Sequence, residues 1–262
     1  TAPATLTTGT APSGGTGSYT YQWEVSTNGT SWNTISGATQ SSYSPPALTA
    51  NRYYRRIVTS GSCGSEPTPA ILITVMPVVT PGSIGSNQAV CYNTAPAQLT
   101  TVTAPSGGSG TYSYLWQRST DNSTWDDITS ATGASYTPPA LTTETYFRRR
   151  VISAGCTPVY SNSVLITINP LPEPVISGDV SPCFGTQRVY TTPSVTNHSY
   201  SWTVFNGVIV GSSTGNSVTV RWNVAPGPAW VRVTERNDIT NCQATTPNYP
   251  VTVNPQAPGA AV

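Results

Sequence analysis

The strongest constraint on this chain is that it repeats itself. Residues Thr1–Pro77 match Thr94–Pro170 at a constant offset of 93, without a gap and with about half of the positions identical. The opening TAPATLTTGTAPSGGTGSYTYQW returns as TAPAQLTTVTAPSGGSGTYSYLW. A fixed internal period means that one structural unit is used more than once. The two copies must therefore share one fold, and each position in one copy serves as a control for the other.

Short alternating segments in the second copy predict strands, and no segment has helical periodicity. The expected strands are Gln98–Thr103, Tyr112–Arg118, Trp125–Ile128, Tyr146–Ile152 and Val164–Ile168. Runs rich in Gly, Pro, Asn and Ser separate them and interrupt any helix. The pattern predicts an all-β fold in which each copy is an antiparallel β-sandwich of the immunoglobulin type.

A third segment, from Pro172 to about Pro255, has no gapless match to the first two but is also β-rich. Tyr200 and Trp202 alternate with small polar residues, as in a half-buried strand. Asn206-Gly207 is a strong hairpin signal, because Asn-Gly suits a two-residue turn with positive φ. The segment therefore predicts a third sandwich.

The three segments end in similar ways, each with a short β-rich run that stops at a proline. The boundaries predict four parts: a repeat at residues 1–77 that is truncated at its N-terminus, a repeat at 78–170, a third sandwich at 171–255, and the start of a following linker or module at 256–262. Proline removes a ladder donor and fixes φ, so each joint is expected to be semi-rigid.

The charge composition argues against nucleic acid and membrane insertion. The chain has no lysine, and its 11 arginines face 10 carboxylates for a net charge of +1. Such a balance produces no long-range field for a polyanion. The most apolar stretch, 70–79, is broken by Pro77 and is far shorter than the ~20 residues that span a bilayer.

Five cysteines point to disulfides in an oxidising compartment, because they form no C-x-x-C pair and the chain has a single histidine. We expect no metal and no cofactor. Because the two cysteines of the complete copy and the two of the third segment each fall within one sandwich, the repeat predicts the disulfides Cys91–Cys156 and Cys183–Cys242. Cys63 is then unpaired through truncation, since the offset places its partner three residues before Thr1.

No constellation of residues indicates an enzyme. A hydrolase triad needs an oriented base, and His198, the only histidine, lies in a loop-like run that favours a surface position. The acidic pair Asp126 and Asp127, considered for glycoside hydrolysis or calcium together with Asp121, is not retained in the first copy. We therefore predict neither catalytic residues nor a calcium site.

The aromatic and arginine residues read as structural. Trp23, Trp116 and Trp202 sit in strands like the core tryptophan of an immunoglobulin sandwich, and Trp230 also reads as core. Surface Trp and Tyr are the usual platform for sugars, but Trp32 and Trp125 are expected to cover the sheet edge. The arginines at 55–56 and 148–150 alternate between faces, which predicts pairing and stacking within each sandwich.

Two groups of motifs resemble known families. The third segment, with YSWTVFNG, NSVTVRW and two cysteines, resembles the PKD-like domains of very large secreted Bacteroidetes proteins, although it lacks a WDFGDG signature. The first two, with Tyr-x-Tyr-x-Trp and S-Y-x-P-P-A-L-T, resemble Ig-like repeats of the same proteins, including gliding-motility adhesins. This resemblance implies type IX secretion and display on the cell surface.

The sequence thus favours a non-catalytic stalk of a cell-surface adhesin or filament, which projects a binding tip. Its expected partners are neighbouring domains of the same chain, the secretion machinery, and surface glycans or other surface proteins. The alternative is a carbohydrate-binding accessory region of a secreted polysaccharide-degrading enzyme. The flanking sequence would separate the two, because more repeats favour a stalk and a catalytic domain favours the alternative.

Overall fold

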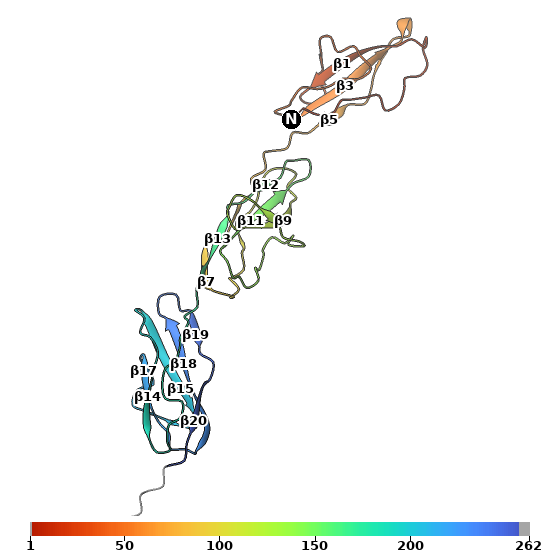
Figure 1. Ribbon diagram of the computed structural model, residues 1–262. Helices are drawn as coiled ribbons and strands as arrows, with labels where there is room; N and C mark the ends of the chain where they lie inside the picture. Colours follow the sequence, from red (N-terminus) through yellow and green to blue (C-terminus); the bar gives the residue numbers. More distant parts are fainter. Residues whose placement is uncertain (1, 257–262) are drawn as a thin grey trace, which may run out of the picture. The chain divides into compact units, whose positions relative to one another are not determined.

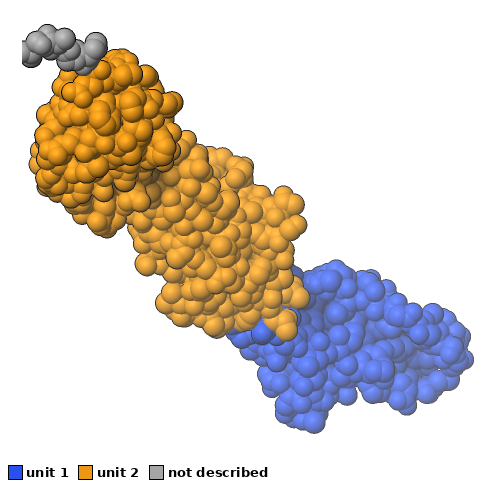
Figure 2. Space-filling model, turned by 90° about the horizontal axis from the view of Figure 1, so that it is seen from below, with its two compact units in different colours: residues 1–79, 107–110 blue, residues 80–106, 111–262 orange. Residues whose placement is uncertain are grey.

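The computed structural model describes residues 2–256, which form β-strands joined by turns and one short 3-10 segment (Figure 1). The chain divides into two compact units (Figure 2): residues 1–79 with 107–110, and residues 80–106 with 111–262. The second unit contains two separate hydrophobic cores. The expected all-β fold of tandem immunoglobulin-like sandwiches is confirmed. We call residues 2–77, 78–170 and 171–255 sandwiches 1, 2 and 3, and these boundaries remain predictions; the expected module start at 256–262 lies, after Gln256, outside the described residues.

Sandwich 1 is built on a single continuous sheet. Its strands are β1 (Thr20–Ser26), β2 (Asn33–Thr34), β3 (Arg52–Thr59), β4 (Ser65–Pro67) and β5 (Ile71–Ile73). The sheet order is β2-β1-β3-β4, and β5 pairs with the start of β3. An antiparallel bridge between Leu6 and Tyr43 belongs to the facing layer.

Sandwich 2 repeats this sheet and adds strands at its start. The strands of sandwich 2 are β6 (Ser83–Ile84), β7 (Gln88–Cys91), β8 (Thr101–Thr103), β9 (Ser113–Ser119), β10 (Asp126–Asp127), β11 (Thr145–Ile152), β12 (Val159–Tyr160) and β13 (Val164–Asn169). The main sheet runs β10-β9-β11-β13-β7, and β6 pairs with β8. β7 runs parallel to β13, an exception to the expected antiparallel pattern.

Sandwich 3 has two distinct sheets. Its strands are β14 (Gln187–Thr191), β15 (His198–Phe205), β16 (Val208–Val210), β17 (Ser217–Arg221), β18 (Gly227–Asn237), β19 (Gln243–Thr245) and β20 (Tyr249–Val253). One sheet is β14-β17-β16, and the other is β15-β18-β19 with β20 also on β18. The core between them includes Tyr190, Trp202 and Trp222.

The three sandwiches share one frame around a buried tryptophan. Trp23, Trp116 and Trp202 are 3%, 0% and 2% exposed. Each indole Nε1 donates to a backbone carbonyl at 2.9 Å, of Gln40, Gly133 and Gly215 respectively. Sandwich 3 therefore uses the packing of the first two, although its sequence does not match theirs.

The prediction of a hairpin at Asn206-Gly207 is wrong. Asn206 does adopt a positive φ of 60°, but β15 and β16 belong to different sheets. A Cβ on Gly207 would lie 2.7 Å from the Trp222 ring and 2.9 Å from Val220, so the chain passes close over the core at this turn. The turn carries the chain from one layer to the other.

Trp230 was also misplaced by the sequence reading, because it is only partly buried. Along β18 the buried positions are Ala229, Val231 and Val233, so Trp230 points to the opposite face. There its ring stacks on Phe205 with centroids 5.9 Å apart, and the Arg232 guanidinium lies 4.7 Å from it.

Candidate functional site

Two cysteines each lie at the end of a sandwich from which the chain exits, one in sandwich 2 and one in sandwich 3. Cys91 ends β7 and pairs in parallel register with Asn169, and Cys183 forms a parallel bridge with Asn254. Each asparagine directly precedes the proline at the predicted exit, Pro170 or Pro255. We call Cys91 and Cys183 the exit cysteines.

The exit cysteines begin the same turn, which the sequence reading missed. The residue after each is aromatic, Tyr92 or Phe184, and its backbone N–H donates to the asparagine carbonyl at 2.8 Å. The next residues, Asn93 and Gly185, have positive φ values of 58° and 84°. A threonine follows, and its N–H returns to the cysteine carbonyl. The pattern Cys-aromatic-Asn/Gly-Thr was the available signal that these cysteines are equivalent.

The other three cysteines occupy a second equivalent position, in the hairpin that follows the longest strand of each sandwich. Cys63 lies between β3 and β4, Cys156 between β11 and β12, and Cys242 between β18 and β19. The N–H groups of Cys63 and Cys156 donate to the serine carbonyl three residues earlier. The Cys242 carbonyl accepts from Asn237 and closes its hairpin. We call these the hairpin cysteines.

One disulfide is formed, and it joins an exit cysteine to a hairpin cysteine of the next sandwich. Cys91 is bonded to Cys242, with their Cα atoms 5.6 Å apart, so the bond ties sandwich 2 to sandwich 3. Cys63, Cys156 and Cys183 are free. The expected pairs Cys91–Cys156 and Cys183–Cys242 are therefore wrong.

Strand geometry explains why the expected pairs do not form. In sandwich 2 the exit cysteine lies beside Asn169, just past the pair Thr145–Ile166, whereas Cys156 lies past the far end of β11. About ten residues of extended strand separate the two levels, which is roughly 33 Å. A disulfide needs Cα atoms within about 7 Å. The same argument separates the two cysteines of sandwich 3.

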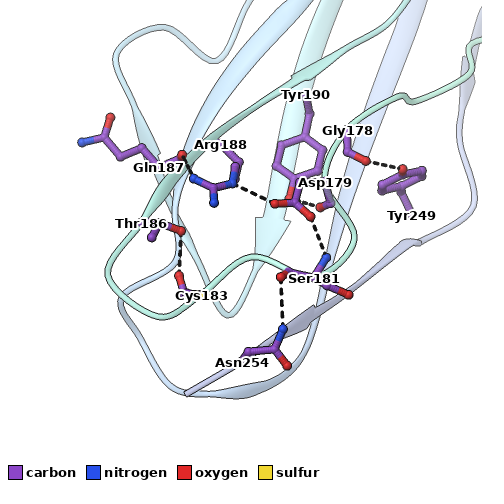
Figure 3. A network of polar contacts seen from close by, with 10 residues as sticks. All are labelled: Gly178, Asp179, Ser181, Cys183, Thr186, Gln187, Arg188, Tyr190, Tyr249 and Asn254. Carbon is purple, nitrogen blue, oxygen red and sulfur yellow. Dashed lines mark hydrogen bonds and ion pairs between the residues drawn. The ribbon is translucent and has the colours of Figure 1, made fainter. Parts of the chain in front are cut away.

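A network of polar contacts surrounds the free exit cysteine (Figure 3). The Cys183 carbonyl accepts from the Thr186 hydroxyl at 2.6 Å, and Asn254 Nδ2 donates to the Ser181 carbonyl at 3.0 Å. Nearby, Arg188 Nε lies 2.8 Å from an Asp179 carboxylate oxygen. Hydrogen bonds from the Ser181 backbone and Arg188 lower the pKa of Asp179. The network fixes the backbone that carries Cys183.

A second network at this end anchors the loop to the core. The Tyr190 hydroxyl donates to the Asp179 carbonyl at 2.7 Å, and the Tyr249 hydroxyl donates to the Gly178 carbonyl at 2.8 Å (Figure 3). Burial raises the pKa of Tyr190 to about 12, so its phenol stays protonated as a donor.

The arginine clusters serve the sandwiches themselves, as expected. Arg149 is fully buried, and Nη1 donates to the Thr101 hydroxyl and the Ala134 carbonyl. Its guanidinium lies 4.5 Å from the Tyr114 ring centroid, and burial lowers its pKa. In sandwich 1, Arg56 makes the same contacts at the equivalent positions.

The neighbouring arginines cover the tryptophans considered for sugar binding. Arg55 lies 4.3 Å from the Trp32 ring centroid. Arg148 lies 4.1 Å from Trp125 and 4.1 Å from Tyr160. A guanidinium on a ring face takes the surface on which a sugar would stack, so these contacts support the expectation that Trp32 and Trp125 are structural.

His198 is not a surface residue, contrary to expectation. It begins β15, its side chain is 13% exposed, and Nδ1 lies 2.6 Å from Oε1 of Glu235, whose side chain is 5% exposed. The partner comes from the adjacent strand β18. The run interpreted as a loop is a turn at residues 196–197 followed by the start of β15, which places the ring beside a buried carboxylate.

The acidic residues of sandwich 2 are engaged in local contacts. Asp121 accepts hydrogen bonds from the Thr124 and Ser123 backbone N–H groups and from the Ser119 hydroxyl, which hold its pKa well below the usual range. Asp127 accepts from Gln117 at 2.7 Å. Within residues 2–256, no three His, Cys, Asp or Glu side chains gather as a metal site. The described part of the chain also has no helix of the length and apolarity that crossing a bilayer requires.

Fold and cysteine positions together define a tandem immunoglobulin-like repeat protein with a disulfide between successive sandwiches. The chain belongs to the family described as Domain of unknown function (DUF8696), whose model matches residues 1–77 and again residues 80–170. The two matches coincide with the internal duplication and leave out the third segment. No curated protein matches the chain.

The chain is also similar, at low sequence identity, to several solved structures. The FN1–FN3 domains of chicken CNTN1 are 13% identical, with 90% of this chain and 88% of that chain covered and a TM-score of 0.29. A marsupial T cell receptor is 9% identical, with 92% and 93% covered and a TM-score of 0.43. The fibronectin(III)-like modules of Clostridium thermocellum CbhA are 13% identical, with 68% and 95% covered and a TM-score of 0.31. At this level of similarity no function passes from those proteins to this one.

Proposed function

We propose that this chain is a load-bearing structural segment of a large secreted surface protein, without catalytic activity of its own. In the finer version of this proposal the parent protein is a Bacteroidetes adhesin or filament of the gliding-motility type, exported by the type IX route. The segment then acts as a stalk that holds a binding region away from the cell. It contacts neighbouring modules of its own chain.

The observation that carries the proposal is the disulfide between Cys91 and Cys242. A linker between sandwiches is the weakest part of an array, because few contacts cross it. A covalent bond across the junction gives tension a path that does not depend on those contacts. An enzyme or a lone binding module gains little from such a bond, whereas a segment under tension gains directly.

The bond also shields most of the chain from tension. When the chain is pulled from its ends, force passes from Cys91 to Cys242 through the sulfur atoms, and the 150 residues between them lie in a closed loop. At about 3.3–3.6 Å per extended residue, the loop hides about 500 Å of chain length. The strands that lie within this loop can unfold without lengthening the chain between its two ends.

Other features agree with a structural role. One face of the Trp32 ring and one face of the Trp125 ring are each covered by an arginine, which speaks against the alternative of a carbohydrate-binding accessory region. The low charge of the surface limits association between neighbouring arrays through ionic contacts.

Single-molecule force spectroscopy tests the proposal. The oxidised chain, held by its ends, should extend by about 500 Å less than the same chain under a reducing agent. Cys242→Ser should extend like the reduced chain, and Cys63→Ser, which removes a free thiol, should behave like the oxidised parent. Equal extension of oxidised and reduced chains would contradict the load path.

A further inference from the structure

The three free cysteines occupy the same positions as the two bonded ones. Cys183 is an exit cysteine like Cys91, and Cys63 and Cys156 are hairpin cysteines like Cys242. No free cysteine stands at a third kind of position. The free thiols are thus of the same two kinds that form the Cys91–Cys242 bond.

The equivalence of the exit cysteines rests on backbone geometry rather than on the presence of sulfur alone. Both lie in parallel register with an asparagine before the exit proline, and both start a turn with a positive φ two residues later. The network of Figure 3 holds the backbone at Cys183 in place. Cys183 is free and partly exposed, so it is not enclosed in the core of its sandwich.

We propose that modules of this type are joined in series by exit-to-hairpin disulfides, of which Cys91–Cys242 is one example. Cys183 is the site for the hairpin cysteine of a following module. Cys63 and Cys156 each take the exit cysteine of the module that precedes their own. The partner is therefore another sandwich of this kind, and not a small thiol, a metal or an unrelated protein.

The chemistry needs a disulfide oxidant, such as oxidised glutathione or a thiol oxidoreductase of the secretory compartment. The thiolate of Cys183 attacks one sulfur of the oxidant and releases the other as a thiolate. The hairpin thiolate of the next module then attacks the mixed disulfide at the Cys183 sulfur and releases the second oxidant thiolate. Two protein thiols lose two electrons and two protons, and the oxidant gains them as two thiols.

The test adds one module to the chain. A second copy of residues 171–255 is placed directly after Pro255, which keeps the spacing that separates sandwich 2 from sandwich 3. In the added copy Cys183→Ser leaves only the hairpin cysteine, and Ile239→Val gives its peptide a distinct mass. Ile239 is 72% exposed, so this label should not disturb the fold.

The chain is refolded with oxidised and reduced glutathione and mapped by mass spectrometry without reduction. We expect Cys183 linked to Cys242 of the added copy, with Cys91 still linked to the original Cys242. A control in which the added copy carries Cys242→Ser should leave Cys183 reactive toward a thiol reagent. Cys183 linked to Cys242 of its own sandwich, or free while the Cys91 bond has formed, would overturn the proposal.

Discussion

Sandwiches 1 and 2 are identical at about half of the positions in the repeated stretch, but they differ in how well their last strand is covered. Val164 and Ile166 on β13 are fully buried. Ile71, the equivalent of Val164, is 41% exposed, and the adjacent Leu72 is 47% exposed. The same strand is a core strand in one copy and a half-exposed edge strand in the other.

Residues 78–93, which precede the repeated sequence of sandwich 2, cover its last strand. In sandwich 2 this segment supplies Ile84, which is 3% exposed and packs in the core, and the strand β7 on β13. The Asn87 side chain accepts from the Leu165 backbone at 2.9 Å. Sandwich 2 is therefore completed by the segment that precedes its repeated sequence, and that segment also carries the exit cysteine Cys91.

Truncating a buried residue of β13 should have the largest effect on this comparison. Ile166→Ala should lower the unfolding free energy of sandwich 2 by about 3 kcal/mol, because it opens a cavity in a closed core. Ile73→Ala, at the equivalent half-buried position, should cost sandwich 1 only about 1 kcal/mol. Hydrogen exchange of peptides from each sandwich measures both. Equal costs would show that residues 78–93 do not close the core.

The buried arginine of each repeat gives the next largest effect. Arg149→Ala should destabilise sandwich 2 by about 2.5 kcal/mol, because it leaves a cavity where the buried side chain was. Arg149→Met fills the space without a buried charge and should stay within about 1 kcal/mol of the parent. In sandwich 3 the position opposite the core tryptophan Trp202 is held by the buried apolar residue Val233 instead of an arginine. Urea unfolding of the parent and the two variants measures these changes in unfolding free energy. A Met variant as unstable as the Ala variant would mean that the cation itself is required.

A smaller effect on stability should distinguish Arg55 from its equivalent Arg148. Arg55 pairs with Glu24 at 2.7 Å in sandwich 1, whereas its equivalent Arg148 pairs with the neutral Gln117 at 2.8 Å. Glu24→Gln copies sandwich 2 and should cost about 0.5 kcal/mol, since the pair is partly exposed. Denaturation at low and high salt should show that the loss disappears as salt screens the ion pair. A loss that is independent of salt would assign it to packing instead.

The smallest difference between sandwiches 1 and 2 should appear in their stability at low pH. Asp121 caps its turn as a carboxylate with a lowered pKa, whereas the equivalent Asn28 makes the same kind of hydrogen bonds without titrating. A group with a lowered folded pKa contributes stability that is present above its unfolded pKa and is lost as pH falls below it. Sandwich 2 should therefore weaken relative to sandwich 1 below about pH 4. Asp121→Asn should abolish that difference, and if it persists in the variant another acid is responsible.

Much of the fold could be predicted from the sequence because the repeat and the alternation are local and strong. The tryptophan positions follow from Tyr-x-Trp strands, and β11 begins within one residue of its expected start. The outward face of Trp230 could not be seen until the register of β18 was known. The layer change at Asn206-Gly207 depends on the close approach of Trp222, which is a tertiary contact without a local signal.

The disulfide pairing failed for a different reason. Assigning two cysteines to each sandwich assumed that cysteines in one domain are close together. The parallel pairing of β7 with β13 places Cys91 at one end of the sheet, and Cys156 lies at the other. The repeated Cys-aromatic-Asn/Gly-Thr turn showed which cysteines are equivalent, but only the strand order shows which end they occupy.

Peptide mapping of the purified, oxidised chain without reduction tests the central claim most directly. After digestion with thiols blocked, we expect one cross-linked peptide pair that contains Cys91 and Cys242, with Cys63, Cys156 and Cys183 recovered as blocked thiols. Linked peptides that join Cys91 to Cys156 and Cys183 to Cys242 would contradict it. That result would return each bond to a single sandwich and remove the covalent joint between modules.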